Sequence, residues 1–310
     1  LIFYKFSKFI PCKVCHSNWF AIMAVICMTT ATPATARMAD RCDEPVFGAA
    51  NIVIDKIAAT AAEAQKTGVD AAAQTAFHQV VNRVLLSSVD QDEFATAHSY
   101  DAFTDFVHII EEKSLEKRYI ARLDFCFDAE RMRTALQNVG LQWAELKSPP
   151  ILVLPVWKDP DGASAWLKNN SWIAGWQDVV DHYQGLVSFR RLPHSLTHER
   201  RFRGSDLLAG DPIKLAAAAR IADAEQVLVV AATLDYEGSK RVVDIEVRLF
   251  DNTGQPITTI LSQSNIMLSK TDSMSLDAMR QTIIGRIEGS WHSANLINSS
   301  AAVTCLSTCR

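Results

Sequence analysis

The chain has 310 residues, 48% of them hydrophobic, and its 31 basic against 35 acidic side chains give a formal net charge of −4. This balance excludes the strongly basic surface by which many proteins hold nucleic acid, so we expect no nucleic-acid partner. The length exceeds the commonest size of a single domain, and we therefore expect two domains.

The first 36 residues have the pattern of a cleaved export signal. Three lysines and no acidic residue open the segment, the apolar run Trp19–Met28 follows, and small residues lead to the predicted cleavage site. The apolar run is about half of the roughly 20 residues needed to cross a bilayer. The sequence thus predicts a signal peptide at 1–36, no transmembrane span after its removal, and a periplasmic protein with a net charge of −7.

Four cysteines lie beyond the predicted signal, in a compartment that permits disulfides. They are Cys42, Cys126, Cys305 and Cys309. The last two are close enough in sequence to pair with each other, but the sequence leaves the pairing open. Two tail thiols offer too few ligands for a structural zinc site, and we expect neither a metal nor a cofactor.

Residues 37–148 are predicted to form a small β-α-β-β-α domain. A first strand is expected over 51–58, and apolar residues at three- and four-residue steps within Val69–Val84 predict a long helix. Glu111–Phe127 contains an alternation of aromatic and polar side chains, which indicates sheet with one buried face. The second helix, Asp128–Val139, has an aspartate at its start and a glycine after its end.

Residues 149–292 are predicted to form a mixed-sheet α/β domain with flanking helices, after a proline pair that marks the boundary. Ile151–Trp157 is apolar on both faces, as a central strand covered by helices on both sides would be. The further elements expected are a helix within 163–183, a strand Gly185–Arg190, a helix Pro212–Ala222, strands Gln226–Leu234, Arg241–Phe250 and Ile257–Met267, and a last helix from near Asp272. Residues 293–310 are expected to be a flexible tail. The fold class is therefore α/β (α+β).

Several strings in the chain resemble the bacterial DUF 2066 family. They are Ser114–Asp128, Pro149–Trp157 and the tryptophans at 166, 172 and 176. The resemblance runs over about residues 50–267. Its members look like exported proteins with no assigned activity, so it implies export and leaves the function open. The chain departs from the pattern at Arg190–His194, where a turn rich in proline and acidic residues is expected, and any role of that turn is in doubt.

The second predicted domain is similar to the α/β domain shared by the TolB amino-terminal domain, the curli-export lipoprotein and the middle domain of flagellar assembly protein T. The likeness rests on Ile151–Trp157, Ala222–Val230 and Glu246–Gly254. Those proteins are assembly and docking modules of the bacterial envelope. The resemblance implies a docking role but does not name a partner.

A basic segment stands out in this otherwise acidic protein. It contains Arg190, Arg191, Arg200, Arg201 and Arg203. Because guanidinium groups suit carboxylates and phosphates, the segment predicts docking to an envelope protein or an anionic envelope polymer. The alternative is a solvated loop without a partner.

Tryptophan and histidine supply the remaining candidates. The spacings of six and four between Trp166, Trp172 and Trp176 do not fix one helical face, so Trp172 is a candidate surface anchor, although packing in the core is the favoured interpretation of the three. His194 and His198 have the spacing of metal ligands on a helix, but they lack the order in which a glutamate lies between them. We expect exposed histidines and no metal site.

Motifs of known catalytic chemistry are absent from the sequence, including the nucleophile elbow, the Walker loop and the dinucleotide glycine pattern. We assign no catalytic residue. The sequence favours a non-enzymatic binding or scaffold protein of the cell envelope. Two alternatives stay open: an envelope hydrolase with a site assembled from distant residues, and a small-ligand binder that uses a tryptophan-lined cleft between the domains.

Overall fold

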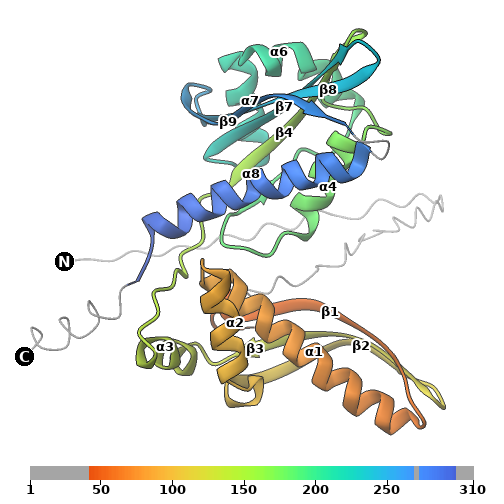
Figure 1. The fold of residues 1–310 in the computed structure, drawn as a ribbon, viewed down its shortest axis with the longest axis vertical. Helices are drawn as coiled ribbons and strands as arrows, with labels where there is room; N and C mark the ends of the chain where they lie inside the picture. Colours follow the sequence, from red (N-terminus) through yellow and green to blue (C-terminus); the bar gives the residue numbers. More distant parts are fainter. Residues whose placement is uncertain (1–41, 269–271, 298–310) are drawn as a thin grey trace, which may run out of the picture. The chain divides into compact units, whose positions relative to one another are not determined.

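Two β-sheets, each covered by its own helices, make up the structure (Figure 1). The first sheet has one hydrophobic core, and the second has a core on each face. The computed structural model describes residues 42–268 and 272–297, which belong to one compact unit. The mixture of helices and sheets confirms the predicted α/β class. The division into two domains near residue 148 stays a prediction, and the predicted signal peptide lies outside the described residues.

The first sheet is antiparallel, with the strand order β1-β3-β2. The part of the chain that forms this sheet and its helices contains β1 (Gly48–Ile57), α1 (Ala61–Val84), α2 (Ser88–Ala97), β2 (Thr104–Ser114), β3 (Arg118–Phe127) and α3 (Ala129–Asn138). Two features differ from the prediction: α2 was missed, and β2 begins well before residue 111. Both have few buried side chains, so neither carries an apolar period that could have predicted it.

The core of this region lies between the sheet and α1. Tyr119, Ala121 and Leu123 in β3 are buried on the face toward α1, as predicted, but Asp124 and Cys126 on the opposite face are buried as well, so the end of β3 does not have the single buried face that was expected. The disulfide Cys42–Cys126 ties the start of the described chain to β3, a pairing that the sequence left open. Cys305 and Cys309 lie outside the described residues.

The second sheet has the order β5-β4-β7-β8-β9, and β6 also pairs with β4. Its strands are β4 (Ile151–Asp159), β5 (Gly162–Ser164), β6 (Phe189–Arg190), β7 (Gln226–Glu237), β8 (Lys240–Asp251) and β9 (Pro256–Met267). β4 runs parallel to β6 and β7, and the other pairs are antiparallel. The predicted strand 185–190 is reduced to the two residues of β6.

Helices cover both faces of this sheet. They are α4 (Ser171–His182), α5 (Leu196–Arg201), α6 (Gly204–Ala209), α7 (Pro212–Ala222) and α8 (Asp272–Ala294). Alternate residues of β4 enter two separate cores, one with α4 and α8 and one with α6 and α7, which confirms the predicted central strand. The helix predicted over 163–183 is shorter, because 162–164 pairs with β4 and Asn170 caps a helix that starts afterwards.

The carboxyl end of the described chain is more ordered than predicted. α8 extends to Ala294, and Ile297 forms an isolated β-bridge with Trp143. The predicted flexible tail thus cannot begin at Ser293, because that residue lies within α8. Residues 298–310 of the predicted tail lie outside the described residues.

Two helix glycines are expected to respond in opposite ways to alanine. A Cβ at Gly175 in α4 would lie 2.1 Å from the guanidinium carbon of Arg280 in α8, a side chain that is only 3% exposed. Moving that side chain would break its hydrogen bond to the Ser171 carbonyl oxygen (3.1 Å). Gly175→Ala should therefore lower the free energy of unfolding by about 1–3 kcal/mol.

Gly285 in α8 is the matched control, because nothing lies within 4 Å of a Cβ placed there. Gly285→Ala should raise the free energy of unfolding by about 0.5–1 kcal/mol, since alanine restricts the unfolded chain and favours helix. Urea denaturation of both variants measures the two changes. Equal changes in the two variants would contradict close packing of α4 on α8.

Candidate functional site

The predicted basic segment divides into two parts with different environments. Arg190 in β6 donates hydrogen bonds to the carbonyl oxygens of Ala222 (2.8 Å) and Asp223 (2.5 Å) and pairs with the Asp223 carboxylate (3.0 Å). Arg191 forms two hydrogen bonds to the Asp181 carboxylate, at 2.6 and 2.9 Å. Carboxylates of the protein itself thus neutralise both arginines, and this makes them poorer candidates for docking to a partner than unpaired arginines.

The other three arginines form an exposed group that we name the basic corner: Arg200, Arg201 and Arg203. The first two end α5, and Arg203 is the N-cap of α6, so the segment predicted as a loop contains two short helices. Within the described chain, the guanidinium groups of Arg200 and Arg203 have no hydrogen bond or ion pair, and that of Arg201 lies 5.4 Å from the ring centre of Phe202. The basic corner is therefore available to an external anion.

The backbone beneath the basic corner is anchored in the core. Phe202 is fully buried, and its carbonyl oxygen accepts a hydrogen bond of 2.7 Å from the indole of Trp166. Gly204 lies so close to β5 that an added Cβ would be 2.5 Å from the backbone of Ala163. These contacts hold the three arginines on a fixed support, which lowers the entropy lost on binding.

Trp172 is not a surface anchor, and this prediction is wrong. Its side chain is completely buried, its indole donates to the Val230 carbonyl oxygen (3.0 Å), and its ring meets that of Trp176 edge-on at 5.8 Å. Trp166 and Trp176 are buried as well, which confirms the alternative of core packing. These tryptophans therefore do not line a cleft for a ligand.

The histidine pair lies beside Trp166 without the geometry of a metal centre. His194 Nε2 is 3.9 Å from the Glu199 carboxylate, and His198 Nδ1 is 2.8 Å from the Pro193 carbonyl oxygen. Nowhere in the described ranges do three or more His, Cys, Asp or Glu side chains gather as they would around a metal ion.

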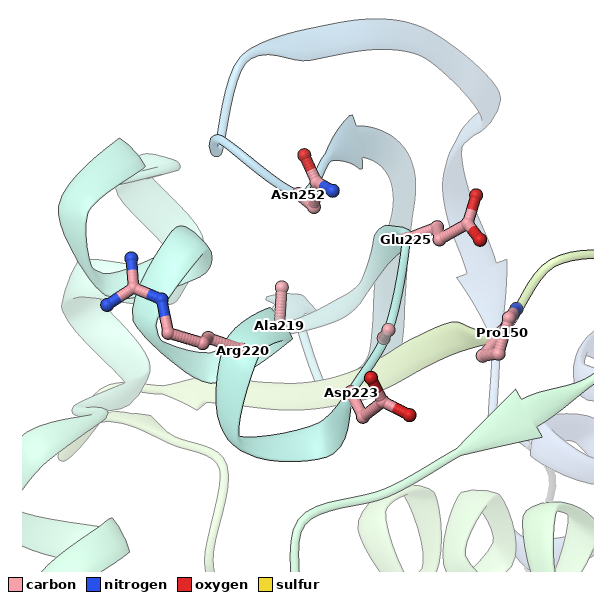
Figure 2. A pocket seen from close by; sticks show the side chains of 7 residues that line it. Pro150, Ala219, Arg220, Asp223, Glu225 and Asn252 are labelled. Atoms are coloured by element: carbon pink, nitrogen blue, oxygen red, sulfur yellow. The ribbon is translucent and has the colours of Figure 1, made fainter. Parts of the chain in front are cut away.

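A cavity of about 330 Å³ lies where α7 ends and β4 and β7 begin. Figure 2 shows that its charged side chains diverge: Arg220 points away to one side, and the carboxylates of Asp223 and Glu225 point in different directions. The cavity brings no reactive groups together.

A second cavity, which we name the α8 groove, measures about 490 Å³ and lies between the last turns of α8 and the sheet. Its lining combines polar side chains with an aliphatic part formed by Ile151, Val187, Leu228, Leu249 and Ile287. Among the described residues that line it, Arg286 is the one with a charged side chain. No sequence pattern predicted this groove, because its residues come from four strands, a helix and two connecting segments.

A buried group of polar side chains joins α1 to α8 and was also missed. Arg83 is 7% exposed and donates to the carbonyl oxygens of Val46 (2.6 Å), Gly48 (2.7 Å) and Gln184. Burial lowers the pKa of its guanidinium to about 10, while the charge of Glu288 acts in the opposite direction. The one sequence signal was an arginine on the apolar face of the predicted helix.

Glu288 is the carboxylate of this group. It accepts hydrogen bonds from the Tyr183 hydroxyl and from the Leu186 N–H (2.8 Å), and it lies 3.4 Å from His292 Nε2. Burial by itself would raise its pKa, but the hydrogen bonds from His292, Tyr183 and Leu186 outweigh burial and lower it. Burial and the Glu288 charge together raise the pKa of Tyr183. The group thus fixes backbone segments, and it does not open into any cavity described above.

Comparisons with known proteins found only solved structures of low similarity. Neither a protein family nor a curated protein matches the chain, so the DUF 2066 resemblance stays a hypothesis. Lipoprotein GNA1162 from Neisseria meningitidis is 18% identical over 45% of this chain and 96% of its own, with a TM-score of 0.28. The hypothetical protein CT253 from Chlamydia trachomatis is 15% identical over 46% and 96%, with a TM-score of 0.29.

Scores this low carry no argument about function. The two similar structures are a bacterial lipoprotein and a hypothetical bacterial protein, and nothing further is transferred from them. Across the residues that the structure describes, none of the helices combines the length and apolar character needed to cross a membrane.

Proposed function

We propose that the chain is an exported protein of the bacterial envelope that works by binding, and that the basic corner is its contact surface for an anionic partner. The observation that carries the proposal is the contrast within one segment. Arg190 and Arg191 are paired with internal carboxylates, whereas Arg200, Arg201 and Arg203 are exposed and have no ion pair within the described chain.

The chemistry of the basic corner favours carboxylate or phosphate groups. Guanidinium groups present several donors in a plane and form two parallel hydrogen bonds with such anions. Three of them within four residues, in a protein with an acidic net charge, make a local site of opposite sign. An envelope protein with an acidic face or an anionic envelope polymer fits this surface.

Export is supported by the disulfide. Cys42 and Cys126 are 84 residues apart in sequence and are bonded, and such structural disulfides belong to oxidising compartments such as the periplasm. The export pattern of the first 36 residues agrees with this location.

The test is recovery of the partner from the periplasmic fraction of the producing bacterium, by crosslinking to the tagged protein and stringent washing. Changing Arg200, Arg201 and Arg203 together to Gln should lower recovery at least about tenfold, because each lost hydrogen bond from a charged group contributes about 1.5–3 kcal/mol.

The matched control changes three exposed lysines in the region of the first sheet, Lys66, Lys113 and Lys117, to Gln. It removes the same charge and should leave recovery of the partner unchanged. Equal recovery with the arginine variant and the wild-type protein would remove the basic corner from the proposal, and so would equal losses in both triple variants.

A further inference from the structure

The α8 groove has the size and lining of a small-ligand site. Its volume of about 490 Å³ lies within the range of about 300–1,000 Å³ that such sites occupy. It is formed by the start of β4, the start of β7, the end of β8, the start of β9 and the last turns of α8. Most of its residues belong to one sheet and one long helix, and Ser148, Pro149 and Val187 come from connecting segments.

The floor of the groove is aliphatic and continuous across the sheet. Val153, Leu228 and Leu249 are register partners on neighbouring strands, and the last two line the groove. Ile151 and Val187 extend this floor, and Ile287 closes it from α8. Leu228 is fully buried and Val187 is 3% exposed, so the floor is shielded from solvent. An unbranched aliphatic chain fits such a floor.

The charge of the described lining of the α8 groove is positive. Arg286 is exposed, and the one hydrogen bond that it forms with a described residue, to the Ile260 carbonyl oxygen, is long at 3.4 Å. Arg286 forms no ion pair within the described chain, and the lining contains no Asp or Glu. Most of its donors are therefore free for an anion. The hydroxyl groups of Ser290 and Thr259 add polar contacts to the same lining.

We propose that the α8 groove binds a fatty-acid-type anion, with the aliphatic chain on the floor and the carboxylate at Arg286. This ligand site is separate from the contact surface proposed at the basic corner, and neither proposal depends on the other. The groove belongs to the face of the sheet that α4 and α8 cover, whereas the basic corner belongs to α5 and α6, and α6 packs with the core of the other face.

The experiment is isothermal titration of the full chain with dodecanoate and with dodecan-1-ol, both below the concentrations at which they aggregate. Dodecanoate should bind to one site. Arg286→Gln should weaken dodecanoate at least about tenfold, the loss expected for one charge-assisted hydrogen bond, and should leave dodecan-1-ol unchanged. The variant with all three arginines of the basic corner changed to Gln should bind dodecanoate as the wild-type protein does.

Ser290→Trp should abolish the binding of both compounds, because an exposed position in the lining then carries a large ring that fills the groove. Thr282→Trp is its control, since Thr282 is exposed on α8 and lies outside the lining. Binding that persists in Ser290→Trp overturns the proposal, as does the absence of any binding to the wild-type chain. If the chain binds dodecanoate only after removal of residues 298–310, that segment is the occupant of the groove. This result would overturn the proposal that a fatty-acid-type anion binds there.

Discussion

Replacing both Cys42 and Cys126 by serine is expected to lower the free energy of unfolding by about 4–5 kcal/mol. The disulfide closes a loop between residues 84 positions apart, so in the unfolded chain it removes much of the conformational freedom of that segment. Both cysteines are nearly fully buried, at 4% and 2% exposure. Few single features of a domain this size contribute as much, since total stability is about 5–15 kcal/mol.

The loss should appear as a shift of the urea midpoint in the double variant, and the wild-type protein should show the same shift after reduction. A variant with Cys305 and Cys309 changed to serine is the control, because it replaces two cysteines without touching the Cys42–Cys126 bond. If the double variant at Cys42 and Cys126 unfolds within about 1 kcal/mol of the wild-type protein, long-loop closure does not stabilise this fold in the way the entropy argument requires.

Local signals in the sequence predicted the parts of the fold that local chemistry determines. Asp128 accepts a hydrogen bond from the Arg131 N–H and begins α3, and Asp211 does the same for Ile213 and begins α7. The two-sided apolar run of β4 predicted a strand between two helical layers, which the structure confirms. Caps and apolar periods act over a few residues, so one sequence is enough to see them.

The candidate sites depended on partners far away in the chain and were harder to predict. Nothing near Arg190 or Arg191 in sequence indicated that Asp223 and Asp181 would neutralise them, which divided the predicted basic segment. The tryptophan spacing was ambiguous because Trp166 lies outside the helix that carries the other two. The α8 groove required the register of the strands, which no local pattern contains.

Arg83→Met is expected to lower the free energy of unfolding by about 3–5 kcal/mol, the cost typical of removing one partner from a buried charged group. Three carbonyl oxygens, those of Val46, Gly48 and Gln184, would lose their donor. Glu288 would also lose a nearby positive charge in a site where burial strengthens electrostatic interactions. Methionine keeps much of the side-chain volume, so the change tests the guanidinium more than the packing.

Arg118→Met is the control, because Arg118 likewise forms several hydrogen bonds, here two to the carboxylate of Asp55, but both side chains are about half exposed. Solvent screens that pair, and its loss should change the free energy of unfolding by less than about 1 kcal/mol. Urea denaturation of the two variants side by side measures the difference. Because Arg83 contacts backbone from residues 46–48 and from residue 184, its variant should also expose both segments to limited proteolysis earlier than the control. Similar stabilities and cleavage rates in the two variants would show that burial adds nothing to the interactions of Arg83.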